Sequence, residues 1–488
     1  MKRLNGMDAM LLYSEAPNLH THTLKVAVVD TTEFPQPFTF EVFRSVVGRR
    51  LHLLEPLRYR LVDIPFKLHH PMWLPDCTVD LDYHLRQVRV PEPGGRRELD
   101  QVIGDVASSP LDRSRPLWEL YFAEGLAGSR IAVIGKVHHV LADGVASANL
   151  LARGMDLSGG LTDERDAPAA VTPPSSAELV RSAAQDHLAQ LAELPSLVKD
   201  AVGGFRDVRR RSRQRGPVPD MAKPFAAPPT FLNHVVSPTR TFASAPLALA
   251  QVKETAKKLE STINDVILAT AAGALRSLLL RYDGHADEPI VASVPVSTDR
   301  SPERISGNMI SGLMVSLPVH LTDPLERLKV TARSASIAKE DHELIGPDLY
   351  SRFMSYLPTA LAPSIFRWQA ARADHNRLMN VPVSNVPGPR ERGRLGGAVV
   401  TEIYSTGVLS SGVGINITVW SYVDQVNIAV LSDDRTFCDT HEATDAMVDA
   451  FAELRAAAGF TDPLTVPPSA LPRAFAPTGV PPSPVNPE

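Results

Sequence analysis

Cysteine is scarce in this chain, because its 488 residues include only Cys77 and Cys438. Two cysteines so far apart exclude a disulfide-rich scaffold and a cysteine-based metal site, although a single bridge between them stays open. This usage is typical of a reducing compartment. Histidine offers no metal site either, since the adjacent His138 and His139 have no third ligand at a recognisable spacing. We therefore expect no metal.

A charge excess of one sign is also missing. The chain has 50 Lys and Arg residues against 55 Asp and Glu residues, which gives a formal net charge of -5. Proteins that bind a phosphate backbone usually carry a basic footprint, so we expect no nucleic acid partner.

Long uninterrupted hydrophobic runs are absent as well. The most apolar windows, residues 131–151 and 266–280, contain His, Asp, Lys or Arg and are not continuous bilayer spans. Residues 1–17 contain no continuous apolar core of the kind that a secretory signal needs. We expect a cytoplasmic protein that contacts the inner membrane surface or lipid inclusions only peripherally.

The composition that remains is typical of a globular protein, with 44% apolar and 22% charged residues. The length exceeds what one hydrophobic core usually supports, so two domains are expected. Short β-prone runs alternate with helical stretches in two series, which predicts an α/β (α+β) protein of two lobes. The runs are LKVAVVD and RIAVIGKV in the first series, and PIVASVPV, GLMVSLPVHL, AVVTEIYST, GINITVWSY and QVNIAVLS in the second. The expected divisions are a first lobe at 1–160, a linker with a helix and an Arg-rich segment at 161–228, a second lobe at 229–462, and a mobile Pro-rich tail at 463–488.

The clearest chemical signal is the segment KVHHVLADGVASANLLARG, which begins inside the β-prone run RIAVIGKV. It places His138, His139 and Asp143 where a strand leads into a helix, and open α/β folds hold their ligands at the ends of strands. A neutral imidazole is well suited to accept a proton near pH 7. The alternative, common for an arbitrary pair of histidines, is a buried pair with Asp143 as the cap of the helix.

The spacing HHxxxDG, here from His138 to Gly144, is the signature of the coenzyme A-dependent acyltransferase superfamily, whose members resemble chloramphenicol acetyltransferase. Further segments narrow the resemblance to the bacterial wax ester synthase/acyl-CoA:diacylglycerol acyltransferase family. In chain order, these segments are LNGMDAMLLYSE, SSPLDRSRPLWEL, STINDVILATAAGAL, VPVSTDR, SGNMISGLMVSLPV and SNVPGP. The resemblance therefore extends over both expected lobes.

This resemblance implies two chloramphenicol acetyltransferase-like lobes, each a mixed sheet packed with helices, with the active site in the channel between them. It implies an O-acyltransferase that moves a long-chain fatty acyl group from its co-substrate acyl-CoA to diacylglycerol and also to long-chain alcohols. It assigns His139 as the general base, with no acyl-enzyme and no cofactor. In agreement, neither cysteine has a neighbouring histidine, and the sequence contains no GxSxG motif.

The resemblance gives Asp143 a structural role, because in the superfamily this carboxylate usually points away from the imidazole and pairs with an arginine. Arg300, in VPVSTDR, is the predicted partner, since a buried carboxylate without a cation is unfavourable. Gly144 is expected to let the backbone turn tightly into the helix. For His138, packing and hydrogen bonding both stay open.

Polar residues of the second lobe are candidates to bind substrate or to stabilise the oxyanion of a tetrahedral intermediate, namely Asn264, Asp265, Ser384, Asn385 and Thr418. Asn264 and Asp265 also stand where a helix is expected to begin, so helix capping is an equally good interpretation. Trp118, in the Pro-Leu-Trp segment, is expected to pack in the core beneath the site.

Two segments offer contacts for an oily substrate or a membrane. Residues 349–373 combine apolar rings with flanking arginines, which suits a membrane interface, although an ordinary core helix pair fits as well. The linker segment RDVRRRSRQR, residues 206–215, concentrates arginines that an anionic leaflet would attract. A solvated linker without a partner is the favoured interpretation there, because no strong apolar face is evident beside the arginines.

Two alternatives to this function stay open. A related acyltransferase could use another acceptor, such as a polyketide, a glycopeptide or a lipid alcohol, but SNVPGP and PLW weigh against it. A catalytically weak paralogue could bind lipid or coat lipid inclusions, but the intact His139 and Asp143 argue against such decay.

Overall fold

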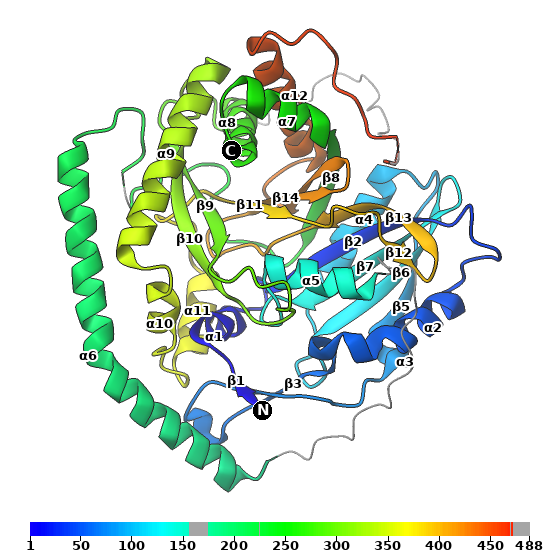
Figure 1. The fold of residues 1–488 in the computed structure, drawn as a ribbon, viewed down its shortest axis with the longest axis vertical. Helices are drawn as coiled ribbons and strands as arrows, with labels where there is room; N and C mark the ends of the chain where they lie inside the picture. The colour runs from blue at the N-terminus through cyan, green and yellow to red at the C-terminus, as the bar shows by residue number, and fades with distance from the viewer. Residues whose placement is uncertain (156–173, 224, 469, 472–488) are drawn as a thin grey trace, which may run out of the picture.

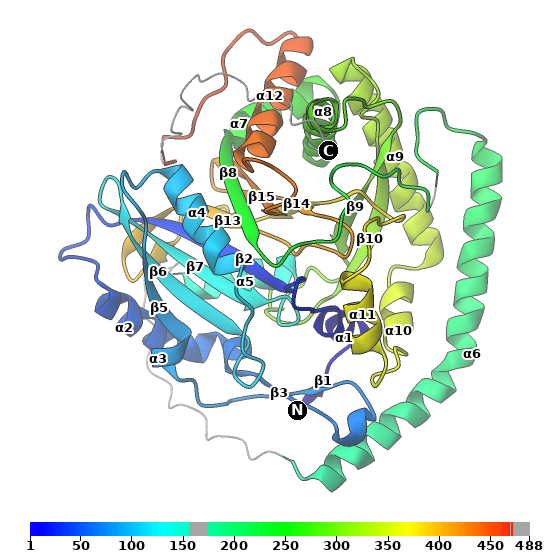
Figure 2. The same cartoon turned by 180° about the vertical axis from the view of Figure 1, so that it is seen from behind.

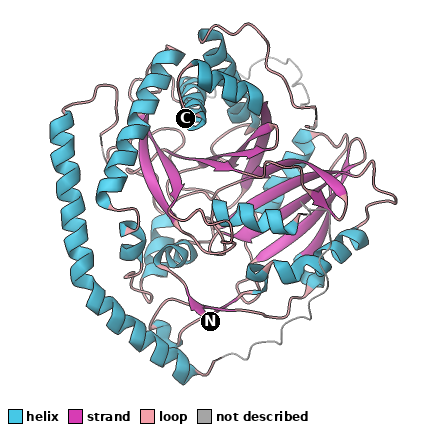
Figure 3. Ribbon diagram, viewed as in Figure 1, coloured by secondary structure: helices cyan, strands magenta, loops and turns pink. Residues whose placement is uncertain are grey.

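The computed structural model describes residues 1–155, 174–223, 225–468 and 470–471, and its two lobes are visible in Figure 1 and from behind in Figure 2. Each lobe is built on a six-stranded mixed sheet packed with helices, drawn in magenta and cyan in Figure 3. The fold class expected from the sequence is thus confirmed. Most of the tail predicted at 463–488, and the start of the predicted linker, lie outside the described residues.

The first sheet carries the histidine pair to one end of a central strand. Its strand order is β12-β13-β2-β7-β6-β5. The bounds are β2 (His22–Asp30), β5 (Leu85–Arg89), β6 (Trp118–Leu126), β7 (Arg130–His138), β12 (Arg394–Leu395) and β13 (Ala398–Ser405). β2 and β7, which form at the expected β-prone runs, pair antiparallel with His22 opposite His138. His138 is therefore the last residue of β7.

Helices and a small sheet surround this first sheet. The helices are α1 (Gly6–Tyr13), α2 (Phe40–Arg50), α3 (Leu81–His84), α4 (Arg96–Ala107) and α5 (Gly144–Gly154), with 3-10 turns at 51–53, 55–58 and 65–67. The small sheet has the order β1-β4-β3, formed by β1 (Lys2–Arg3), β4 (Met72–Leu74) and β3 (Arg60–Val62). α4 packs against the second lobe, where a Cβ on its Gly104 would lie 3.0 Å from the carbonyl oxygen of Arg240.

The second sheet has the order β10-β9-β11-β14-β15-β8. Its strands are β8 (Arg240–Ala248), β9 (Ile290–Ser297), β10 (Ile310–Leu317), β11 (Val381–Pro387), β14 (Ile415–Tyr422) and β15 (Gln425–Asp433). The helices of this part of the chain are α7 (Leu249–Lys258), α8 (Ile263–Tyr282), α9 (Pro324–Ile345), α10 (Leu349–Met354), α11 (Ala362–Ala370) and α12 (His441–Ala457). Of the helices in the described ranges, α8 is the one long and apolar enough to cross a membrane, and 67% of its apolar window is buried inside the protein.

One strand crosses the division that the sequence suggests. β13 lies within the predicted second lobe, 229–462, yet it pairs antiparallel with β2 of the first sheet, with Ser405 opposite Lys25. The expected boundary therefore needs this correction. A β-prone run such as AVVTEIYST has the same local pattern in either sheet, because strand preference reflects packing context and not the identity of the partner strand.

α6 (Ser176–Arg215) forms the helix expected in the linker. It begins with a capping box, in which the Ser175 backbone N–H donates to the Glu178 carboxylate at 2.7 Å. It runs along the outside of the molecule, beyond α9 and α10, at the left edge of Figure 1 and the right edge of Figure 2. Only a narrow face is buried, where Leu197 and Ala201 pack with Leu349.

Candidate active site

His138 is held inside the protein by hydrogen bonds. Its side chain is fully buried, and its Nδ1 accepts the backbone N–H of Val140 at 3.1 Å. With Nδ1 acting as acceptor, Nε2 carries the proton and donates to the Thr21 hydroxyl oxygen at 2.9 Å. Both ring nitrogens are therefore occupied. The contacts fit a residue that fixes the end of β7.

His139 is held by its backbone and leaves its imidazole free. Its N–H donates to the Thr21 carbonyl oxygen at 2.8 Å, and its carbonyl oxygen accepts from the Asn308 side-chain amide at 2.7 Å. The ring Nδ1 is enclosed beside the backbone of His139 itself, whereas Nε2 is not enclosed and makes no hydrogen bond to another described residue. Burial lowers the pKa of His139, and the nearby Lys25 ammonium lowers it further. A neutral imidazole able to accept a proton is therefore favoured at neutral pH.

Asp143 points into the loop and not at His139. It caps α5 by accepting the Ala146 N–H at 2.9 Å, and it accepts the Met309 N–H at 3.0 Å. The Arg304 guanidinium binds both of its oxygens, with Nη1 to Oδ2 at 2.9 Å and Nη2 to Oδ1 at 3.0 Å. The carboxylate is thus fully engaged in structural contacts.

The predicted partner of Asp143 was wrong by four residues. Arg300 is exposed, whereas the Arg304 side chain is only 10% exposed and donates in addition to the carbonyl oxygens of Gly307 and Asp299. The loop that follows β9 contains both arginines. Residues 301–304 form a turn, in which the Arg304 N–H donates to the Ser301 carbonyl oxygen. The turn thus ends at Arg304, the arginine that points inward.

Residues 304–309 of the second lobe lie directly beside the His139 loop. The Gly307 N–H donates to the Leu141 carbonyl oxygen at 2.7 Å, and the Asp143 N–H donates to the Gly307 carbonyl oxygen at 3.3 Å. Gly307 has a φ of +77°, a conformation that favours glycine. In the sequence, the segment SGNMISGLMVSLPV, which contains Asn308, indicated only the family resemblance. The support that Asn308 and the preceding Arg304 give to the His139 loop was not predicted.

Asp8, from LNGMDAMLLYSE, is the second support that sequence reasoning missed. Its Oδ1 accepts from Asn308 twice, from the backbone N–H at 2.9 Å and from the side-chain amide at 2.8 Å. The same amide of Asn308 also donates to the His139 carbonyl oxygen. Burial raises the pKa of Asp8 to about 7. α1 thus reaches His139 through one side chain.

The raised pKa of Asp8 predicts a pH-dependent stability. A free aspartate has a pKa of about 3.9, so between pH 4 and 7 the folded chain binds more protons at this site than the unfolded chain does. The stabilising contribution is full below about pH 4 and is lost as the pH rises to about 7. Asp8→Asn does not titrate, so wild type should lose roughly 2 kcal/mol of unfolding free energy relative to this variant between about pH 5 and pH 8. Urea titrations of both proteins measure this difference, and a constant gap would contradict the prediction.

The candidates on β11 and α8 divide between two faces of the second sheet. The Asn385 side-chain amide donates to the side-chain oxygen Oδ1 of Asn264 at 3.4 Å, which places Asn385 on the face that α8 covers. Ser384 and Val386 are on the opposite face, because side chains alternate along a strand. That face meets the first lobe, since a Cβ on Gly144 would lie 3.0 Å from Val386. Ser384 is therefore the member of this pair that faces the histidine loop.

Three other candidates have structural partners. The Asp265 carboxylate caps α8, accepting the Thr262 N–H at 3.0 Å and its hydroxyl at 2.6 Å. The Thr418 hydroxyl accepts the Gly407 N–H at 3.0 Å and donates to Asn416 at 2.8 Å. Trp118 is fully buried, and its indole N–H donates to the Leu57 carbonyl oxygen at 2.7 Å. These contacts match capping and core packing.

Lys25 brings a positive charge to the region between the sheets. From β2, its ammonium donates to the Ser405 hydroxyl at 2.6 Å and lies 5.5 Å from the centre of the Trp420 ring. Burial lowers the pKa of Lys25 to about 8. Lys25 was not among the residues that sequence reasoning selected, because an isolated lysine in a strand gives no local signal.

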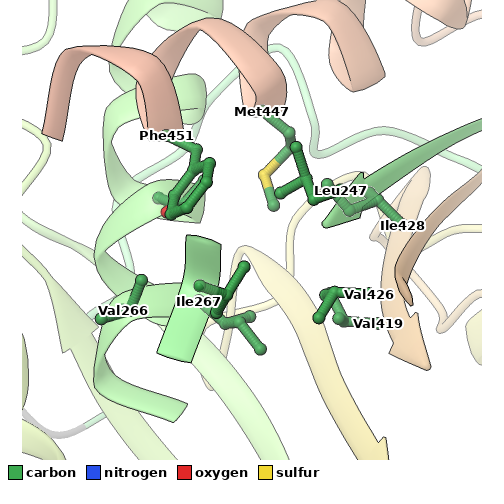
Figure 4. A pocket seen from close by; sticks show the side chains of 10 residues that line it. Leu247, Val266, Ile267, Val419, Val426, Ile428, Met447 and Phe451 are labelled. Atoms are coloured by element: carbon green, nitrogen blue, oxygen red, sulfur yellow. The ribbon is translucent and has the colours of Figure 1, made fainter. Parts of the chain in front are cut away.

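A small cavity lies elsewhere in the second lobe, between α8, α12 and the strands (Figure 4). Its volume is about 10 Å³, roughly the space of one water molecule. Its walls are apolar except for Thr270, and it includes none of the predicted site residues. In the described part of the chain, no group of three His, Cys, Asp or Glu side chains could hold a metal ion, and both cysteines are free thiols.

Two mixed sheets, with a histidine at the end of a central strand and an Asp–Arg pair bracing its loop, define the class of two-lobed acyltransferases. The wax ester synthase/diacylglycerol acyltransferase catalytic domain matches residues 4–267, and the WS/DGAT C-terminal domain matches residues 306–455. The chain belongs to the wax ester synthase/diacylglycerol acyltransferase family and is an acyltransferase of this type.

Individual relatives agree with this assignment. The chain is 55% identical over 474 residues to a protein of Mycobacterium tuberculosis H37Rv provisionally named as a diacylglycerol O-acyltransferase, covering 97% of this chain and 100% of the relative. It is 31% identical to the O-acyltransferase WSD of Acinetobacter baylyi, covering 75% and 79% of the two chains.

Solved structures share the fold. The wax ester synthase/diacylglycerol acyltransferase of Marinobacter aquaeolei VT8 superimposes with a TM-score of 0.67 at 24% identity, covering 94% of this chain and 100% of that one. The first condensation domain of the calcium-dependent antibiotic synthetase gives a TM-score of 0.56 at 17% identity, covering 94% and 97%. At these identities the likeness extends to the fold alone.

Proposed function

We propose that this protein transfers a long-chain fatty acyl group from acyl-CoA to the free hydroxyl of diacylglycerol, and also to long-chain alcohols. The names of the relatives support the reaction class. The observation that carries the mechanism is the Nε2 edge of His139, which, unlike the enclosed Nδ1, is not sealed off and has no hydrogen bond to another described residue, on a backbone held from both sides. We further propose that it works in the cytoplasm at the surface of a membrane or lipid inclusion.

In this mechanism His139 removes the proton of the acceptor hydroxyl while the hydroxyl oxygen attacks the thioester carbonyl carbon. The tetrahedral intermediate collapses, the carbon–sulfur bond breaks, and the proton passes from the imidazolium to the leaving thiolate of CoA. Asp143 does not bind the ring and acts through Arg304 on the loop. No covalent acyl-enzyme is needed. In keeping with this, burial raises the pKa of the Cys77 thiol, which makes it a poor nucleophile.

The Ser384 hydroxyl is the oxyanion donor in this proposal. It lies on the face of β11 that meets the histidine loop, and it makes no hydrogen bond to another described residue. Removing one oxyanion donor typically lowers kcat by about 10²-fold, so Ser384→Ala should do so with little change in KM. Asn385→Ala, one residue away on the other face, is the matched control and should reduce kcat far less. Steady-state kinetics of both variants decide between them, and equal losses would remove Ser384 from the mechanism.

The acceptor is tested with purified protein and radiolabelled palmitoyl-CoA, offering dioleoylglycerol and hexadecanol separately. Label in triacylglycerol, and more weakly in wax ester, is expected. Label in wax ester alone would change the principal acceptor while keeping the chemistry. No product from either acceptor would overturn the proposal and leave an unrelated acceptor or a lipid-binding role.

A further inference from the structure

The long helix α6 exposes an apolar stripe that no described part of the chain covers. Large side chains separated by three or four residues are 39% to 68% exposed, namely Leu188, Leu191, Leu194, Val198, Val202 and Phe205. At roughly 100° per residue, this spacing keeps them on one face. The stripe is about 26 Å long at ~1.5 Å per residue. A monomer in water gains nothing from such a surface, which indicates a partner.

The face continues into positive charge at the C-terminal end of α6. Continuing the same helical spacing places Arg206, Arg209 and Arg213 in line with the stripe. Among the described residues, Arg209 and Arg213 form no ion pair, whereas Arg211 and Arg215 pair with Glu340 on α9. Arg211 and Arg215 thus point toward the body of the protein, whereas Arg209 and Arg213 point away from it.

Acidic side chains of α6 lie on a different face. They recur every seven or eight residues, at Glu178, Asp186, Glu193, Asp200 and Asp207. This spacing aligns them about half a turn away from the apolar stripe. Asp186 and Asp200 bind Arg3 and Arg352 of the protein body. The outward face therefore combines apolar side chains with Arg209 and Arg213, which form no ion pair among the described residues, and none of these five carboxylates lies on it.

We infer that this face of α6, which we name the apolar–arginine face, docks on an anionic lipid surface with the helix axis parallel to it. A helix that lies in the interface buries an apolar stripe among the acyl chains and places its cations beside the headgroup phosphates. A second copy of the chain fits this face less well. Packed parallel, it would bring the arginines together, and packed antiparallel, it would set them against the other end of the helix, where the same face has no carboxylate. The inference specifies the surface through which the lipid acceptors of the proposed function are reached.

The test is flotation of the purified full-length protein with vesicles of phosphatidylcholine alone or mixed with phosphatidylglycerol. Wild type should float with the mixed vesicles and less with phosphatidylcholine alone. Leu191→Asp combined with Val198→Asp should weaken binding at least about tenfold, and Arg209→Glu combined with Arg213→Glu should remove the preference for phosphatidylglycerol. The matched control, Gln185→Asp combined with Ala189→Asp, adds the same charge on the acidic side and should bind like wild type.

Equal binding of the apolar-face variant and its control would overturn the inference, as would the absence of wild-type binding to both vesicles. Analytical ultracentrifugation adds a second criterion. A wild-type dimer that becomes monomeric in Leu191→Asp/Val198→Asp would assign the stripe to a second copy and overturn the lipid assignment, whereas monomers in both support it. Flotation needs neither acyl-CoA nor an acceptor, so its outcome is independent of the proposed acyl transfer.

Discussion

Replacing His139 by alanine should lower kcat for acyl transfer at least about 10²-fold while leaving the folded structure intact. The loss follows because the His139 imidazole, whose pKa is lowered by burial, has an Nε2 that is neither enclosed like Nδ1 nor hydrogen-bonded to another described residue. The fold should survive because the contacts that hold the loop at this position are made by the backbone, to Thr21 and Asn308. The measurement is single-turnover transfer from radiolabelled palmitoyl-CoA, with a urea midpoint on the same preparation.

His138→Ala provides the contrast. Its ring is fully buried and both nitrogens are bonded, to Thr21 and to the backbone of Val140. Its removal should mainly reduce the free energy of unfolding, because a buried cavity and an unsatisfied N–H remain. Normal turnover in His139→Ala would exclude His139 as the general base. If His139→Ala lost turnover only because the protein unfolded, His139 would have a structural role instead.

Local sequence patterns predicted the parts of the fold that local forces decide. The runs that became β2, β7, β9, β14 and β15 are rich in Val and Ile, and a strand with such a pattern forms whichever neighbour it has. The pairing partner is a long-range property. β13 joined the first sheet against the expected boundary, because nothing in AVVTEIYST distinguishes β2 from a strand of the second sheet.

In the candidate site, too, local sequence predicted some features, and others depend on how distant segments pack. The spacing of HHxxxDG predicted the position of His139 and the cap on α5, whereas the choice between Arg300 and Arg304 depended on which arginine a loop turns inward. Because side chains alternate along a strand, Ser384 and Asn385 are predicted to lie on opposite faces of the sheet. Only the folded structure shows that α8 covers the face that carries Asn385. The arginines of α6 were evident in the sequence, while the apolar face beside them is spread over five turns and interrupted by Pro195.

Breaking the Asp143–Arg304 pair should have the second largest effect. The Asp143 carboxylate is fully buried and the Arg304 side chain is only 10% exposed, so removing either partner leaves a buried charge without its counterion. Such changes typically cost about 3–5 kcal/mol of stability, so Arg304→Ala and Asp143→Ala should each lower the free energy of unfolding by roughly that amount. Both should also lower kcat, because residues 139–143 and 304–309 hold each other through this pair.

The double variant Asp143→Ala/Arg304→Ala separates charge from packing. With both charges gone, the free energy of unfolding should recover part of the loss, giving a coupling of the two single changes. Turnover should not recover, because Met309 and the first turn of α5 still lack the oxygens that accept their N–H groups. Arg300→Ala is the matched control, since that exposed side chain lies in the same loop, and it should leave both stability and turnover unchanged. Additive losses in the double variant, or a loss in Arg300→Ala as large as in Arg304→Ala, would contradict the assignment of Arg304 as the partner that holds the His139 loop.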